Sequence, residues 1–362
     1  MKFRLFLFGI VLLLNLNACS MIGYYQQSIS GHLKLWWAQE AIDDVINHPA
    51  TSVQLVEKLQ TAKLARRFAV EQLALPDNKS YLKYADLKRE YVVWNVYAAE
   101  EFSIDPHRWC YFIVGCVSYR GYYAQNDARE KANELKQQGF DTTVEGVAAY
   151  STLGWFNDPL LNTMMHWSET SLVGLIFHEL SHQVLYFPGD AAFNEAFASA
   201  VQRIGVIKWL QQNNPQQLEN YYAYLSRQQD FRQLLLDTRE QLNTLYNQTL
   251  PDEEKRKQKQ KIFTALRIQH QQVKTSRWNN YSGYDQWFAR EINNARLSSN
   301  MTYLELIPAF YALFEQSHGN FVQFFNRVKQ MSELEKNARK QQALDLVKTA
   351  PSLLQLVQKN LI

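Results

Sequence analysis

The arrangement of apolar and polar positions divides the first half of the chain into helices and strands. Helices are predicted over 33–47, 52–74 and 126–138, because Pro49, Pro76 and Gly139 separate or end them. Runs of β-branched and aromatic residues predict strands over 91–98, 111–119 and 141–150. The order strand, strand, helix, strand indicates a small sheet in this half of the chain.

Beyond Gly205 the pattern is helical almost throughout. A long helical hairpin is predicted over 216–247 and 252–273, with Pro251 at its tip, and further helices over 303–316, 320–331 and 333–347. The sequence therefore predicts an α+β fold that is mostly helical. One domain is expected over 19–362, in which 19–210 hold the sheet and 211–362 form a helical lobe.

The stretch 169–187 is mostly apolar and lacks proline, which predicts a buried helix. It contains the segment His178-Glu179-Leu180-Ser181-His182. His178 and His182 are four residues apart, so both imidazoles lie on one face of the helix and can bind one metal ion. Glu179 then lies beside them as the candidate catalytic base, with a carboxylate that can act on a water activated by the metal.

A second helix is expected to supply the third metal ligand. Pro188-Gly189 ends the first helix, and Asp190 can cap a helix that begins near Ala191. In an antiparallel pair His182 and Glu195 each lie about 10 Å from the turn, at about 1.5 Å per residue, and are therefore level. Two imidazoles and one carboxylate suit zinc with one position left for water. The sequence thus predicts one Zn²⁺ ion at His178, His182 and Glu195.

Three segments carry a resemblance to known enzymes. They are 109–122, 149–159 (Ala-Tyr-Ser-Thr-Leu-Gly-Trp-Phe-Asn-Asp-Pro) and the metal motif with Asn194-Glu195-Ala196-Phe197-Ala198. The metal motif resembles that of the gluzincin metallopeptidases, with a shorter connector than in thermolysin. More closely, the chain resembles the bacterial zinc aminopeptidase lipoproteins over most of its length. The resemblance implies a gluzincin-like small sheet beside the zinc helix, a helical C-terminal lobe and aminopeptidase activity on peptides.

Further site residues are candidates only. A peptide commonly adds as a strand to a sheet edge, and the segment 149–154 precedes the zinc helix, so Tyr150 and Ser151 are the candidate substrate-binding residues. Ser199 lies one turn after Glu195 and either supports a ligand or packs the helix. The candidate donors to the reacting oxygen are Tyr281, Tyr284, Tyr303, Tyr311 and His166. The candidate carboxylates for a substrate's free amine are Asp158 and Glu145.

The N-terminus predicts export. Lys2 and Arg4 precede a short apolar run over 5–14, which is typical of a secretory signal and too short for a stable membrane span. The residues before Cys19 resemble a lipoprotein box, so cleavage of 1–18 and lipidation of Cys19 are expected. An ordinary secretory signal with an incidental cysteine is the alternative. Ser20 favours the outer membrane, which predicts a lipid-anchored protein that faces the periplasm.

The charge of the chain bears on its possible partners, and its cysteine content bears on a possible disulfide. The chain has 38 basic and 35 acidic residues, and removal of the signal takes away two basic ones, so nothing indicates binding to nucleic acid. Cys110 and Cys116 form either a disulfide or two free buried thiols. A straight strand of six residues spans about 20 Å, so a disulfide requires the chain to fold back near Gly115.

Three functions remain open from the sequence. The first is a zinc aminopeptidase, and the second is an envelope endopeptidase with the same zinc centre. The third is a non-catalytic lipoprotein whose helical lobe binds a partner. Glu179 favours catalysis, because structural zinc sites are usually closed, rich in cysteine and have no need of a free carboxylate beside a ligand.

Overall fold

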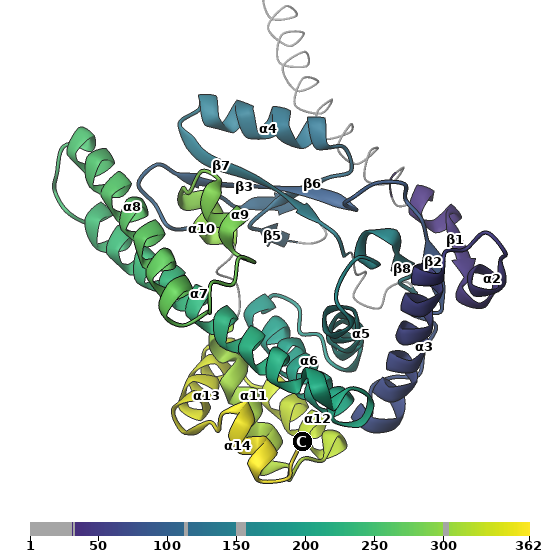
Figure 1. Cartoon of the computed structure of the whole chain (residues 1–362). Coiled ribbons are helices and arrows are strands. Elements are labelled where there is room, and N and C mark those ends of the chain that lie inside the picture. Colours follow the sequence, from purple (N-terminus) through teal and green to yellow (C-terminus); the bar gives the residue numbers. More distant parts are fainter. Residues whose placement is uncertain (1–30, 32, 112–114, 150–156, 300–303) are drawn as a thin grey trace, which may run out of the picture.

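The computed structural model describes residues 31, 33–111, 115–149, 157–299 and 304–362 (Figure 1). The fold is α+β and mostly helical, as the sequence predicted, and its described strands form three small sheets with the orders β1-β2-β8, β6-β3-β7 and β4-β5. No helix in the described part of the chain is both long and apolar enough to cross a membrane.

The first predicted helix is interrupted by a strand. Residues 33–37 are helical, but β1 (Gln39–Ala41) follows and pairs antiparallel with β2 (Lys83–Ala85), before the short helix α2 (Ile42–Asn47). β2 pairs in turn with β8 (Leu160–Leu161). The prediction over 33–47 was wrong because pairing with a distant segment overrides local helix propensity. The next helix, α3 (Val53–Leu73), agrees with its prediction.

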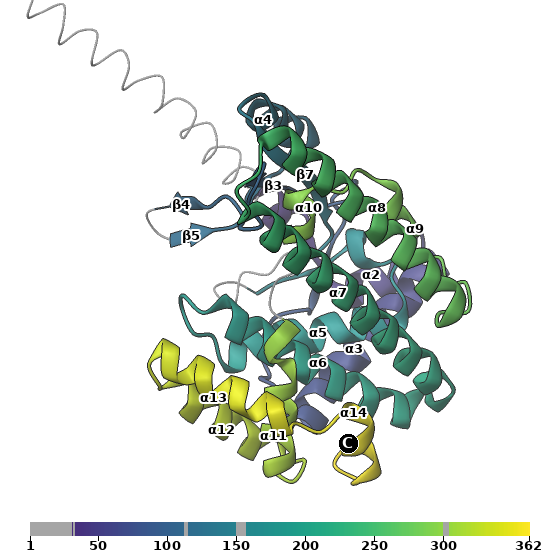
Figure 2. The same ribbon diagram turned by 90° about the vertical axis from the view of Figure 1, so that its left-hand side faces the viewer.

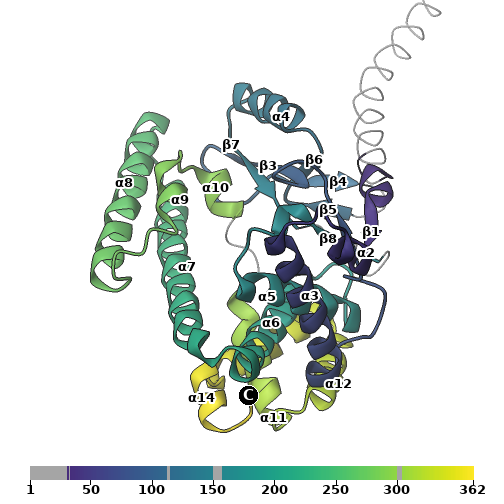
Figure 3. The same cartoon turned by 45° about the vertical axis from the view of Figure 1, so that its right-hand side comes forward.

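The central sheet is antiparallel, with β3 (Val93–Glu100) between β6 (Arg120–Tyr122) and β7 (Phe140–Val147). Helix α4 (Gln125–Gln137) covers one face of this sheet with a buried row formed by Ala128, Ala132 and Leu135. Gly139 has a φ of 92°, a conformation that glycine adopts without strain, and it reverses the chain into β7. Figures 1 and 3 show α4 above the sheet and the short α10 (Asn294–Ser299) below it.

The predicted strand over 111–119 is instead a hairpin. Strands β4 (Trp109–Tyr111) and β5 (Gly115–Val117) pair with each other, with Cys110 opposite Cys116. A disulfide joins these two cysteines, so of the two possibilities that the sequence left open the structure contains the bridge. Figure 2 shows the hairpin projecting from the sheet. The prediction of a single strand was wrong because the disulfide requires the chain to reverse its direction between the two cysteines.

Two antiparallel helices lie at the centre of the molecule. They are α5 (Glu169–Val184), preceded by the 3₁₀ turn η1 (Asn162–Met164), and α6 (Ala191–Asn213). α5 ends three residues before the predicted boundary. One continuous apolar core contains residues of both helices, of α3 and of the C-terminal helices, and Phe177, Phe197 and Phe310 are fully buried in it. Burial on several sides fixes the positions of α5 and α6.

The C-terminal half is a helical lobe, as predicted. After η2 (Pro215–Gln217), helices α7 (Leu218–Tyr246) and α8 (Asp252–Ser276) form the long hairpin. Helices α11 (Ile307–Gln316), α12 (Phe321–Ser332) and α13 (Lys336–Thr349) match the remaining predicted segments, with a 3₁₀ turn η3 (Leu304–Leu306) before α11. The short helices α9 (Asp285–Ala289), α10 and α14 (Leu353–Gln358) were not predicted.

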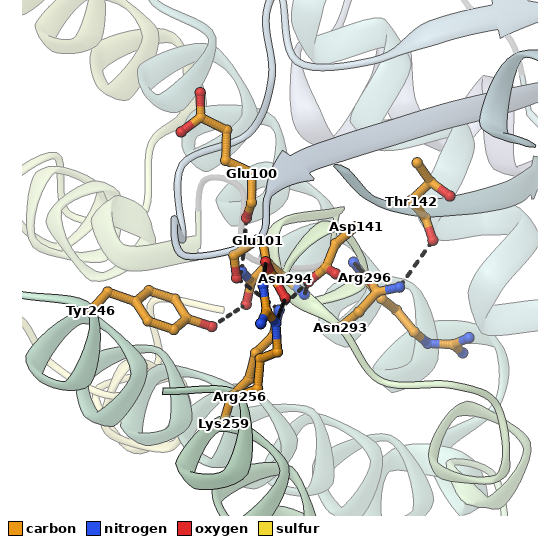
Figure 4. A network of polar contacts seen from close by, with 10 residues as sticks. All are labelled: Glu100, Glu101, Asp141, Thr142, Tyr246, Arg256, Lys259, Asn293, Asn294 and Arg296. Carbon is orange, nitrogen blue, oxygen red and sulfur yellow. Dashed lines mark hydrogen bonds and ion pairs between the residues drawn. The ribbon is translucent and has the colours of Figure 1, made fainter. Parts of the chain in front are cut away.

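A polar network joins the helical hairpin to the end of the sheet (Figure 4). The buried Lys259 of α8 donates to a carboxylate oxygen of Asp141 at 2.7 Å and to the backbone carbonyl of Glu101 at 2.8 Å. Asn294 donates to the same carbonyl at 2.9 Å and accepts a hydrogen bond from the Tyr246 hydroxyl at 2.8 Å. These bonds hold α7, α8 and α10 against the end of β3 and β7.

A buried ion pair joins the last part of the chain to the start of α6. Arg339 of α13 is 1% exposed, and its Nε and Nη2 donate to Oδ2 of Asp190 at 2.9 and 2.7 Å. Its Nη1 donates to the carbonyls of Ser332 and Leu334 at 2.9 and 3.0 Å. The guanidinium also lies 3.9 Å from the centre of the Phe187 ring. Asp190 is therefore held in place by the helical lobe.

We expect Arg339→Met to lower the free energy of unfolding by about 3–5 kcal/mol, because it leaves the buried Asp190 carboxylate without its partner. Urea unfolding followed by circular dichroism measures this change. Lys348→Met is the matched control, since the Lys348–Asp345 pair is mostly exposed and its loss should leave the free energy of unfolding nearly unchanged. Equal destabilisation by the two substitutions would contradict the role assigned to Arg339.

Candidate metal centre

The structure brings His178, His182 and Glu195 together between α5 and α6. The Nε2 atoms of the two histidines lie 3.2 Å apart. Oε2 of Glu195 lies 3.2 Å from Nε2 of His178, and its Oε1 lies 3.5 Å from Nε2 of His182. The three side chains form a group that could hold a metal ion, with one ligand atom from each within 4.8 Å of the others. His182 and Glu195 therefore lie level with each other across the helix pair, as their equal distance from the turn predicted.

The distances between these atoms suit a small tetrahedral ion. Ligand atoms that lie about 2.0–2.1 Å from zinc at tetrahedral angles are separated from one another by about 3.3 Å. The two Nε2 atoms are separated by 3.2 Å, and each has a carboxylate oxygen of Glu195 close to that distance, Oε2 at 3.2 Å from His178 and Oε1 at 3.5 Å from His182. Two imidazoles and one carboxylate leave a fourth tetrahedral position for water or substrate. The donor set therefore fits one metal ion of the zinc class.

The turn between α5 and α6 is fixed by Asn194 of α6 and by Asp190, the residue that caps this helix. Asn194 is 1% exposed; its Nδ2 donates to the carbonyl of Phe187 at 2.8 Å, and its Oδ1 accepts from the Phe187 amide at 2.9 Å. Asp190 caps α6 by accepting a hydrogen bond from the amide of Phe193. Because Glu195 follows Asn194 directly, these contacts set its height relative to the histidines.

Gln202 of α6 orients the first histidine. Its Oε1 lies 3.1 Å from Nδ1 of His178, which places the ring proton on Nδ1 and leaves the lone pair of Nε2 for a metal. A Cβ atom at Gly174 would lie only 2.9 Å from Nε2 of Gln202, so glycine makes room for this side chain. Ser199, the candidate from the sequence, makes no hydrogen bond to either histidine within the described structure.

The charges within the group favour a bound cation. Burial lowers the pKa of His182 to about 4, with a further contribution from His178, so this imidazole is neutral at pH 7. Burial opposes ionisation of Glu195, but the hydrogen bond and charge of His178 outweigh it and lower the pKa of Glu195. Burial lowers the pKa of His178, but its hydrogen bond to Glu195 and the charges of Glu179 and Glu195 outweigh burial and raise it, so a bound metal would replace a proton on this imidazole.

Tyr81 is a residue near the site that the sequence did not indicate. Its side chain is 2% exposed, and its backbone amide donates to the carbonyl of Asp158 at 2.7 Å. Burial above all, and then the charges of Glu179 and Asp158, raise the pKa of Tyr81, so its hydroxyl stays neutral beside Glu179. Its φ of 60° is uncommon for a bulky residue, and such backbone strain often occurs at functional sites.

Several candidates from the sequence lie elsewhere or outside the described residues. Tyr150, Ser151 and Tyr303 fall outside the described ranges. The carboxylate of Glu145 accepts from Arg290 at 2.8 Å, and the hydroxyl of Tyr311 accepts from Arg203 at 3.4 Å. The remaining candidates pack with other aromatic rings: Tyr281 against Tyr284, Tyr284 against Phe231, and His166 against Trp167.

We expect Gln202→Leu to weaken zinc binding by about 10–100-fold, because His178 loses the partner that fixes its ring and its tautomer. Competition with a chromophoric zinc chelator measures the affinity. Gln212→Leu is the control, since Gln212 is an exposed residue of the same helix. Unchanged affinity in Gln202→Leu would show that this hydrogen bond has no part in holding the metal.

The chain matches one family model. The model carries the description "Putative aminopeptidase" and matches residues 23–344, a range that includes both helices of the metal centre. No curated protein and no solved structure matches the chain.

Proposed function

The chain belongs to the family described as "Putative aminopeptidase", and we propose that it is an aminopeptidase that uses one zinc ion. The observation that carries this proposal is the convergence of three suitable ligand atoms next to Glu179. When bound to His178, His182 and Glu195, zinc would lower the pKa of a water molecule and polarise the scissile carbonyl. We infer a gluzincin-like centre, and the position of Glu195 on the second helix of the pair supports this inference.

Glu179 is the proposed general base. It directly follows His178 on α5 and is only partly buried, so its carboxylate remains within reach of water and substrate. It would take a proton from water and deliver it to the nitrogen of the leaving amine. The loop that carries Tyr81 is joined to α5 by a hydrogen bond of 3.2 Å from Gln183 to the hydroxyl of Ser80, which would keep Tyr81 near Glu179.

The proposed peptide-binding edge is the chain that follows β7. Along β7 itself, the carbonyls of Thr142 and Val144 accept hydrogen bonds from Asn293 at 3.0 Å and from Arg290 at 3.1 Å. Beyond the strand, the carbonyl of Ala148 accepts from Thr163 at 2.5 Å. A peptide therefore has little access to these groups. The proposed binding edge is therefore the segment 149–154, with Tyr150 and Ser151 as its proposed contacts, and this proposal rests on the position of the segment before the zinc helix.

The proposed location is the periplasmic face of the outer membrane, with a lipid on Cys19. The proposal rests on the signal over 1–18 and on the residues that precede Cys19. The disulfide between Cys110 and Cys116 supports an oxidising compartment, because such bridges rarely persist in the cytosol.

We expect Glu179→Gln to lower kcat/KM by about 10²–10⁴-fold while one zinc ion per chain remains bound, because the ligands are intact and only the base is lost. Release of nitroaniline from aminoacyl nitroanilides measures the activity, and metal analysis measures the zinc. Glu71→Gln is the control, since Glu71 is an exposed residue of α3. Full activity in Glu179→Gln would refute the role of this residue.

An internally quenched peptide with a blocked N-terminus separates the alternatives. An aminopeptidase leaves it intact and cleaves the same peptide when its amine is free. Cleavage of the blocked peptide, abolished by Glu179→Gln, would identify an endopeptidase. Bound zinc without hydrolysis of any of these substrates would favour the non-catalytic alternative.

A further inference from the structure

The first helical segment of the described chain, residues 33–37, packs one of its faces against the rest of the domain. Leu35 is 3% exposed and belongs to the main apolar core. Gly31 contacts Tyr123 so closely that a Cβ atom there would lie 2.4 Å from the ring. Gly31, Lys34, Leu35 and Ala38 all line one groove against the domain, which fixes the orientation of the segment. Figure 3 shows it beside β1 at the edge of the molecule.

The opposite face of this segment is apolar and exposed. Leu33, Trp36 and Trp37 are 40%, 56% and 71% exposed. Their spacing of i, i+3 and i+4 places them on one side of the helix. The other tryptophans in the described ranges are buried or partly buried, so two adjacent exposed indoles are unusual in this chain. The more apolar side of the helix is the side that points away from the protein.

We propose that Leu33, Trp36 and Trp37 form a membrane-contact surface that inserts into the headgroup region of a lipid bilayer. Tryptophan is enriched at membrane interfaces because its ring is apolar while its N–H can still reach a polar partner. A short helix with an exposed aromatic face is suited to lie in that layer.

The position of this surface in the chain favours a bilayer as its partner. Leu33 follows Cys19, the proposed lipid attachment site, by 14 residues, and such a stretch spans at most about 50 Å. A lipid on Cys19 would therefore keep the three side chains close to the membrane. The location rests on the proposed lipid anchor, whereas binding of the surface to lipid is independent of the anchor and of peptidase activity.

A second copy of the chain is a poorer partner for this surface. A stable interface buries about 800 Å² on each partner. One large aromatic side chain buries about 150–250 Å² when it is wholly covered, and these three side chains are already covered in part. Two indoles and one leucine therefore supply too little area for a dimer, but enough for shallow insertion into a bilayer.

The test uses the mature chain with Cys19→Ser, so that no lipid is attached, and vesicles of phosphatidylethanolamine and phosphatidylglycerol. We expect the protein to sediment with the vesicles, and we expect the additional double substitution Trp36→Ser and Trp37→Ser to lower the partition coefficient by about tenfold or more. Binding should persist at 0.5 M salt, because charge contributes little to it. In brominated lipid, indole fluorescence should be quenched in the parent protein and much less in the variant.

The matched control carries Val53→Ser and Leu64→Ser, which remove exposed apolar side chains of α3, and it should bind like the parent. Circular dichroism and zinc content should be the same in all proteins. A zinc-loaded parent that stays in the supernatant would overturn this proposal without affecting the proposed hydrolysis. Equal vesicle binding by the tryptophan variant would also overturn it. So would tryptophan-dependent dimerisation without vesicle binding, measured by analytical ultracentrifugation.

Discussion

The structure depends on the fixed turn between α5 and α6. A metal ion of the zinc class requires ligand atoms about 3.3 Å apart, and here the ligands come from two helices. Asn194 binds both backbone groups of Phe187, and Asp190 caps α6 while Arg339 holds it. A slip of one residue in either helix would turn Glu195 away from the histidines. The C-terminal lobe thus stabilises the site through the buried Arg339–Asp190 ion pair and through the apolar core that it shares with α5 and α6.

The sequence predicted the parts of this site that depend on local spacing. The four-residue interval between the histidines, the turn at Pro188 and the position of Glu195 are sufficient to place three ligands together. The long helices were also predictable, since each carries its apolar positions at helical intervals between clear end signals. The α+β class followed from the same patterns.

What the sequence could not predict depends on contacts between distant residues. β1 exists because β2 pairs with it, and Gln202 reaches His178 only because α5 and α6 pack antiparallel. Tyr81 lies beside Glu179 through a loop anchored to Asp158, and no local pattern marks it. The hairpin of β4 and β5 could be inferred only on the condition that Cys110 and Cys116 form a disulfide. Tertiary contacts of this kind leave no periodic signal in the chain.

The proposed function requires that α5 and α6 together hold a single metal ion through two imidazoles and one carboxylate. X-ray absorption at the zinc edge of the purified protein tests it most directly. We expect one zinc ion per chain with only nitrogen and oxygen ligands at about 2.0–2.1 Å, including two imidazoles, and loss of one oxygen ligand in Glu195→Ala. A spectrum with sulfur ligands, or one unchanged in Glu195→Ala, would contradict the claim.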